Sequence, residues 1–142
     1  MKTSMNPPEI EFDHVGIAVP SLDVGGEFWQ ALGWPKSHST ETVADQKVKV
    51  AMLPLKNSSQ VELLEPTDST SPVAKFMEKR GPGIHHICFR VKNIDEVLKR
   101  LQGAGVRLIN PTAVKGAHNC RVAFVHPAST GGVLVELSER NP

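Results

Sequence analysis

The sequence lacks several features that would define a class of protein. Its 142 residues contain no run of about 18 apolar positions, which excludes a membrane-spanning helix. Residues 1–10 are polar and have no apolar segment of the kind found in a secretory signal, so we expect a loose N-terminal tail. The net charge is only +1, and no basic stripe is interleaved with aromatic residues, which argues against nucleic-acid binding.

Cysteine is also scarce. Cys88 and Cys120 are the only two, too few for the disulfide framework of a small secreted domain. Two reduced thiols in a cytoplasmic protein are the simplest interpretation. The hydrophobic share of 39% and the charged share of 22% are ordinary for a globular chain, and the length predicts one domain, which we place at residues 11–139.

The chain does contain an internal repeat that carries a histidine in each copy. His14 and His86 each stand five positions before a valine that ends a strand-like run. The sequence Val-Glu-Leu at 61–63 recurs at 135–137, so that Glu62 follows His14 by 48 positions and Glu136 follows His86 by 50. The repeat therefore extends over two whole modules.

Both modules predict the same element order, βαβββ. Module one, residues 11–66, has a helix from Ser21 to about Leu32 and strands at 11–19, about 36–42, 48–54 and 60–65. Module two, residues 84–139, has a helix capped by Asn93 and strands at 85–91, 106–109, 121–126 and 132–138. A bridge helix at 71–81 joins them. The fold class is α+β, an open cupped sheet with helices outside.

Alternation along the first strand of each module separates two faces. His14 shares one face with Gly16 and Ala18, and Asp13 falls on the other. In the second module His86, Cys88 and Arg90 share a face. His85 falls on the opposite face, which predicts that it has a structural role or supports His86 without being a ligand itself. Cys88 is interpreted as a small filler, and Arg90 either contacts an anionic substrate or forms a salt bridge at the rim.

Glu62 and Glu136 each lie between large apolar residues in strands that look central. A carboxylate there is costly unless a cation meets it. Two histidines and two carboxylates form a set suited to a divalent transition metal. We therefore predict a metal site at His14, Glu62, His86 and Glu136. Gln60 faces the same side as Glu62 and is its rival, although the register of the repeat favours Glu62.

These residues lie in motifs that resemble the vicinal oxygen chelate superfamily and, within it, the methylmalonyl-CoA epimerase family. The resemblance is carried by DHVGIAV at 13–19, VKVAMLP at 48–54, VELLEP at 61–66, SPVAKF at 71–76, GIHHI at 83–87, HP at 126–127 and TGGVLVEL at 130–137. It implies a metal at the same four residues, and cobalt, zinc, manganese and nickel all suit such a set.

The resemblance also implies an activity, the interconversion of (2R)- and (2S)-methylmalonyl-CoA by proton removal and return at C2 through a metal-stabilised enolate. Glu136 would be the acid/base on one side of the substrate. Asp45 is the candidate for the other, although Asp45 replaces the glutamate and Lys47 the glycine that the family usually has there. Candidates for contacts with the acyl-CoA are Gln46, Arg90, Gly116 and Ser129. The family further implies a homodimer.

Three other activities fit parts of the pattern. A glyoxalase I-type lactoylglutathione lyase also moves a proton beside a metal. A ring-cleaving dioxygenase uses two histidines and one carboxylate, so the second carboxylate argues against it. A small-molecule binding or resistance protein of the same fold needs no complete set of ligands, and a tightly bound stoichiometric metal would count against it.

Overall fold

A single curved sheet forms the framework of the protein, in a computed structural model that describes residues 8–36 and 39–141. The predicted tail at 1–10 lies mostly outside the described residues. Eight strands are arranged in the order β2-β3-β4-β1-β5-β8-β7-β6. Their bounds are β1 Glu11–Ala18, β2 Ser39–Val43, β3 Val48–Pro54, β4 Gln60–Pro66, β5 Gly83–Arg90, β6 Val114–Lys115, β7 Arg121–Val125 and β8 Val135–Glu139.

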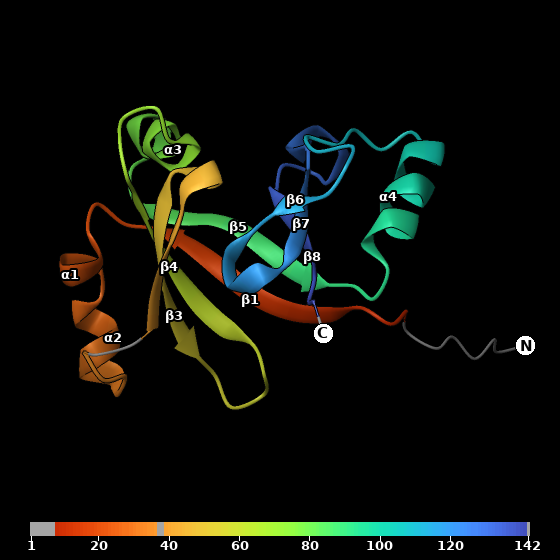
Figure 1. Cartoon of the computed structure of the whole chain (residues 1–142). Helices are drawn as coiled ribbons and strands as arrows, with labels where there is room; N and C mark the ends of the chain where they lie inside the picture. The colour runs from red at the N-terminus through yellow and green to blue at the C-terminus, as the bar shows by residue number, and fades with distance from the viewer. Residues whose placement is uncertain (1–7, 37–38, 142) are drawn as a thin grey trace, which may run out of the picture.

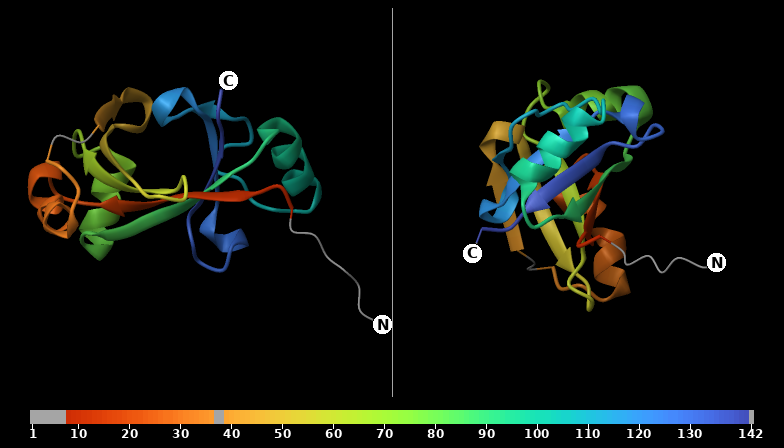
Figure 2. Two further views of the ribbon diagram at one scale, coloured as in Figure 1. Left: turned by 90° about the horizontal axis from the view of Figure 1, so that it is seen from below. Right: turned by 90° about the vertical axis from the view of Figure 1, so that its right-hand side faces the viewer.

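The sheet is built from two halves of like topology. β1 and β5 pair antiparallel at its centre, β4 lies parallel to β1, and β8 lies parallel to β5. Seen from below, β2 and β3 on one side and the segment around β6 on the other curl toward each other above β1 (Figure 2). The two rims touch where the backbone N–H of His118 donates to Glu41 Oε1 at 2.9 Å. The predicted cupped α+β sheet is confirmed.

Helices cover the outer face of each half, at opposite ends of the molecule (Figure 1). α1 (Leu22–Gly25) and α2 (Glu27–Leu32) replace the one predicted helix and meet at Gly26, as the weak helix propensity of the Gly-Gly pair allows. They pack on β3 and β4 through Leu22, Leu53 and Leu63. α4 (Ile94–Gly103) packs on β7 and β8 in the same way. No helix in the described ranges is long and apolar enough to cross a membrane.

The bridge helix, α3 (Pro72–Arg80), closes one end of the cup. Val73 is buried against Val50, Met52 and Leu64, which face inward from β3 and β4. Ser71 begins the helix: its side chain is fully buried and accepts the N–H of Val73 at 3.1 Å. A serine cap followed by proline at the first helical position is the expected start of a helix.

Ser71→Ala is expected to lower the free energy of unfolding by about 1 kcal/mol, because the buried Val73 N–H loses its acceptor. Chemical denaturation followed by circular dichroism measures this change. Ser39→Ala, in an exposed position of edge strand β2, is the matched control and should leave the midpoint unchanged. An equal effect of both substitutions would contradict a specific capping contact.

Module two differs from the prediction at its second strand. The predicted strand at 106–109 is wrong: this segment forms only an isolated bridge between Leu108 and Val125. The Asn110 side chain accepts the N–H of Phe124 at 2.8 Å, and Pro111 has no N–H to continue a ladder. The short β6 stands in its place. β8 also begins later than predicted, because Gly131 and Gly132 have positive φ angles of 82° and 104°.

Candidate metal centre

A cavity of about 710 Å³ occupies the concave side of the sheet. Its floor holds His14 from β1, Glu62 from β4, His86 from β5 and Glu136 from β8, all of them buried. The wall from β3 is apolar, with Val48, Val50 and Met52 facing inward. The four predicted ligands thus come from the four central strands and meet on one floor.

Three donor atoms on the floor form a nearly equilateral triangle. His14 Nε2 lies 3.0 Å from His86 Nε2 and 3.1 Å from Glu136 Oε1, and His86 Nε2 lies 3.0 Å from the same oxygen. Donors about 2.1 Å from one ion, and at roughly right angles as seen from it, lie about 3.0 Å apart. The triangle therefore fits one face of the coordination shell of a divalent ion.

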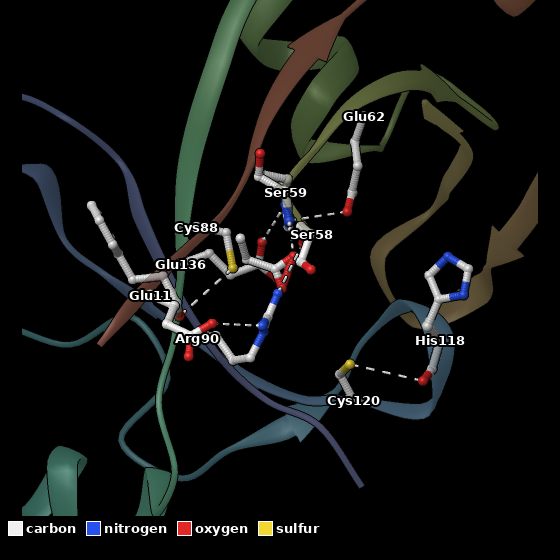
Figure 3. A network of polar contacts seen from close by, with 12 residues as sticks. Glu11, Ser58, Ser59, Glu62, Cys88, Arg90, His118, Cys120 and Glu136 are labelled. Carbon is white, nitrogen blue, oxygen red and sulfur yellow. Dashed lines mark hydrogen bonds and ion pairs between the residues drawn. The ribbon is translucent and has the colours of Figure 1, made fainter. Parts of the chain in front are cut away.

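The Glu62 carboxylate lies on the other side of the His14 imidazole, away from Nε2. Its Oε2 lies 3.0 Å from His14 Nδ1, and not beside the three converging donors. Figure 3 shows its carboxylate in the same network of polar contacts as Glu136 and Arg90. Gln60, the predicted rival, also lines the cavity and pairs with His14 in the β1–β4 ladder, but the hydrogen bonds and ion pairs of the two histidine rings are formed with other side chains. A rotation of the Glu62 side chain is needed before it can join the other donors.

The face assignment of Asp13 and His85 is wrong, because the ladder between β1 and β5 contains two bulges. The pairing runs from Phe12–Phe89 directly to His14–Cys88, which leaves Asp13 unpaired. It then runs from Gly16–His86 to Ile17–Ile84, which leaves His85 unpaired. A bulge turns an extra side chain toward the face of its neighbour. Both residues therefore line the cavity beside the histidines.

The electrostatics of the floor favour a cation between carboxylates. Burial opposes a charge on His14, but hydrogen bonds to Asp13 and Glu136 and the charges of Glu62 and Glu136 outweigh this and raise its pKa to about 10. Burial also opposes ionisation of Glu136, yet hydrogen bonds from His14 and His86 hold the pKa of its carboxyl well below the usual range. Glu136 is therefore ionised at neutral pH.

Cys88 fits the predicted small filler. Its side chain is fully buried, and burial together with the charges of Glu136 and Asp13 raises the pKa of the thiol far above its usual range. A thiol held in this way is a poor nucleophile at neutral pH. Both Cys88 and Cys120 are free thiols.

Among the predicted acid/base and substrate contacts, Asp45 and Gln46 line the cavity from the turn η1 (Ala44–Gln46). Gly116 packs against Val122, and Ser129 Oγ accepts the N–H of Arg107 at 2.9 Å; neither lines the cavity. Arg90 does not line it either. The Arg90 guanidinium donates to Glu11 Oε2 at 3.0 Å and to the Ser58 carbonyl at 3.2 Å (Figure 3).

The sequence prediction missed several polar residues of the cavity. Lys115 and Arg140 line it from the second module and its C-terminal end, and Asn110 contributes an amide; His118, which belongs to the predicted contact segment 116–118, lines it as well. No repeat marks them, because they lie in segments without a counterpart in the first module. Asn110, Lys115 and His118 lie in the segment that crosses from α4 to β7, and Arg140 follows the end of β8.

Comparison with known proteins agrees with this geometry. Residues 13–124 match the family model described as Glyoxalase/Bleomycin resistance protein/Dioxygenase superfamily. Uncharacterized protein YqjC of Bacillus subtilis is 43% identical over 128 residues, 89% of this chain and 90% of that protein. Methylmalonyl-CoA epimerase from Mycobacterium tuberculosis superposes with a TM-score of 0.86 at 43% identity, covering 93% and 89% of the two chains. Methylmalonyl-CoA epimerase in complex with methylmalonyl-CoA and NH4+ has a TM-score of 0.83 at 34% identity, covering 92% and 94%.

Two curled modules around a floor of histidines and carboxylates define a vicinal oxygen chelate protein, a member of the Glyoxalase/Bleomycin resistance protein/Dioxygenase superfamily. Within that superfamily, the chain belongs to the methylmalonyl-CoA epimerase family.

Proposed function

We propose that the protein interconverts (2R)- and (2S)-methylmalonyl-CoA by removing and returning the proton at C2. The observation that carries this proposal is the buried, ionised Glu136 beside two histidines on the floor of the cavity. The C2 proton is flanked by a thioester and a carboxylate, so its removal gives an enolate. A relative of the same fold is known in complex with methylmalonyl-CoA.

The metal centre of the proposal consists of His14, Glu62, His86 and Glu136. The converging donors of His14, His86 and Glu136 support it, and Glu62 would complete the set. When bound, a divalent ion supplies Lewis-acid stabilisation of the negative charge that develops on the substrate oxygens. Cobalt, zinc, manganese and nickel all suit two nitrogen and two oxygen donors.

Glu136 is the base of the proposal on one side of the substrate. Without metal, the two histidines keep its carboxylate ionised; when their Nε2 atoms bind an ion, the positive charge of that ion would do the same, which leaves a carboxylate that can accept and return the C2 proton. Because the same carboxylate contacts both histidines, its position is fixed by β5 and β1 as well as by its own strand.

Inversion requires a second acid/base on the opposite face of C2. We assign this role to Asp45. It lines the cavity from the rim of module one, whereas Glu136 belongs to module two. Gln46 lies beside it, and its amide Nε2 is buried without a hydrogen-bond partner among the described residues. We assign this amide to a substrate oxygen.

Asp45→Asn is expected to slow inversion about 100-fold while leaving deuterium uptake into one stereoisomer in place, because Glu136 still serves one face. Proton NMR of the substrate in heavy water separates uptake from inversion, measured on each stereoisomer in turn. Asp68→Asn, an exposed acid outside the cavity, is the control. If the Asp45→Asn variant inverts the substrate at the unchanged rate, Asp45 is not the second acid/base.

The direct test of the function is exchange at C2. Metal-loaded protein is incubated with methylmalonyl-CoA in heavy water, and deuteration and inversion are followed by NMR. The proposal fails if neither occurs. Activity with methylglyoxal and glutathione would instead identify a glyoxalase I-type lyase, and ligand binding without turnover would identify a resistance protein of this fold.

We also propose a homodimer in the cytoplasm. Val24, Phe28 and Leu32 recur every four residues along α1 and α2, and their exposed fractions of 65%, 63% and 60% are high for apolar side chains. Such a surface suits a second copy of the chain. Sedimentation velocity measures the oligomeric state. The two free thiols are consistent with a reducing compartment.

A further inference from the structure

The two bulges of the central ladder occupy equivalent places in the repeat. Asp13 is the extra residue directly before His14, and His85 is the extra residue directly before His86. The two side chains have different chemistry, a carboxylate in module one and an imidazole in module two. The fold has therefore inserted one residue beside each histidine of the metal centre.

Each inserted side chain contacts the same atom of the histidine that follows it. Asp13 Oδ1 lies 3.4 Å from His14 Nδ1, and His85 Nδ1 lies 2.9 Å from His86 Nδ1. The Nε2 atoms of His14 and His86 face each other at 3.0 Å, on the side of Glu136. In both modules the inserted residue thus lies behind the ring, opposite the donor atom.

We propose that Asp13 and His85 are positioning residues that hold His14 and His86 with Nδ1 protonated and Nε2 directed at the metal. This inference rests on the metal centre of the proposed function. A hydrogen bond at Nδ1 fixes both the tautomer and the orientation of a metal-binding imidazole. His86 Nδ1–H donates to the lone pair of His85 Nδ1, so His85 is neutral and carries its own proton on Nε2.

Different parts of the fold hold the two positioning residues. The ring of His85 packs edge-on against Phe76 of α3, with centroids 5.0 Å apart, so the bridge helix supports His86 indirectly. Asp13 Oδ2 lies 3.5 Å from Arg90 Nε, and Arg90 is itself held by Glu11 and Ser58. Arg90 therefore supports the metal centre indirectly, by holding the Asp13 carboxylate in place behind His14.

This arrangement also explains how Glu62 becomes free to bind. Glu62 Oε2 is 3.0 Å from His14 Nδ1, the atom that Asp13 also contacts. When Asp13 accepts the Nδ1 proton, the Glu62 carboxylate can turn to the metal without leaving His14 unsupported. The two modules then differ: a carboxylate makes His14 the more basic ligand, and a neutral imidazole supports His86.

Metal affinity in a series of His85 variants tests the proposal. His85→Leu removes the acceptor and is expected to weaken binding of Co²⁺ about 10- to 100-fold, measured by competition with a chromophoric chelator. His85→Asn places a carbonyl oxygen on Cγ, where histidine has Nδ1, and should recover most of the affinity. His85→Gln places its amide one bond farther away and should not. The absorption spectrum of bound Co²⁺ should change in the His85→Leu and His85→Gln variants but not in the His85→Asn variant.

Asp13→Asn keeps an oxygen acceptor but removes the charge, and we expect about a 10-fold loss of affinity. The matched control is His126→Asn, whose histidine lies outside the cavity and caps a turn through Nδ1; Co²⁺ binding should be unchanged. Circular dichroism of each metal-free variant verifies folding.

The outcomes are distinct. If His85→Leu binds Co²⁺ as the parent protein does, or if Asn is no better than Leu and Gln, the positioning inference is wrong and the metal centre stands. If the parent protein binds no stoichiometric metal, the metal centre of the proposed function is wrong, and the inference falls with it. If His85→Leu does not fold, the comparison of Asn with Gln still decides.

Discussion

Glu136→Gln is expected to lower the rate of C2 deuteration about 1,000-fold, because the variant loses the ionised carboxylate that accepts the proton. The same substitution removes the anionic oxygen that lies 3.0 to 3.1 Å from both histidines, so the metal content should fall as well. Exchange in heavy water and elemental analysis of the purified protein measure the two effects separately.

Gln60→Ala is the matched control for this variant. Gln60 lines the same cavity from β4 and pairs with His14 in the β1–β4 ladder, but the hydrogen bonds and ion pairs of the two histidine rings are formed with other side chains. It should keep both its metal and its exchange activity. If Gln60→Ala loses metal and Glu136→Gln retains it, the assignment of ligands by the repeat is wrong.

Removal of metal by a chelator is expected to abolish exchange and to lower stability. A ligand that binds only the folded state at about 100 times its Kd stabilises that state by about 2.7 kcal/mol. The free energy of unfolding should rise by this amount when metal is returned, because His14, His86 and Glu136 are brought together only by the folded sheet. Urea denaturation with and without metal measures the difference.

His86→Ala serves as the control for metal removal. Without one of its nitrogen donors, this variant should gain little stability from added metal, while the parent protein gains the full amount. Full exchange activity in protein shown by elemental analysis to be free of metal would contradict the proposed chemistry. Recovery of activity with cobalt, zinc, manganese and nickel in turn identifies the ions that support it.

The repeat made most of the fold predictable. Two histidine-bearing strands and two Val-Glu-Leu strands in matching register predicted two βαβββ modules, and the sheet has that symmetry about β1 and β5. The bridge helix was predictable from its own cap and proline. The segment at 106–109 was not, because its apolar residues pack against α4 and β7 without entering a ladder.

The candidate site was predictable only in part. His14, Glu62, His86 and Glu136 could be chosen from spacing, since each stands at a repeated position in a central strand. For Arg90 the sequence leaves substrate contact and a salt bridge at the rim open, and the structure shows the salt bridge, with the guanidinium held by Glu11, Ser58 and Asp13. The partners of a long side chain depend on the loop between β3 and β4, which no local pattern specifies.

The sequence alone determined which strands carry the metal-binding candidates, because alternation and repetition are local properties of a chain. The tertiary structure decided which nitrogen of each histidine faces the centre and what lies behind it. Alternation places Asp13 and His85 away from the histidines, and the bulges between β1 and β5 bring them back. A bulge is a mismatch between two paired strands, so it exists only once both strands have met.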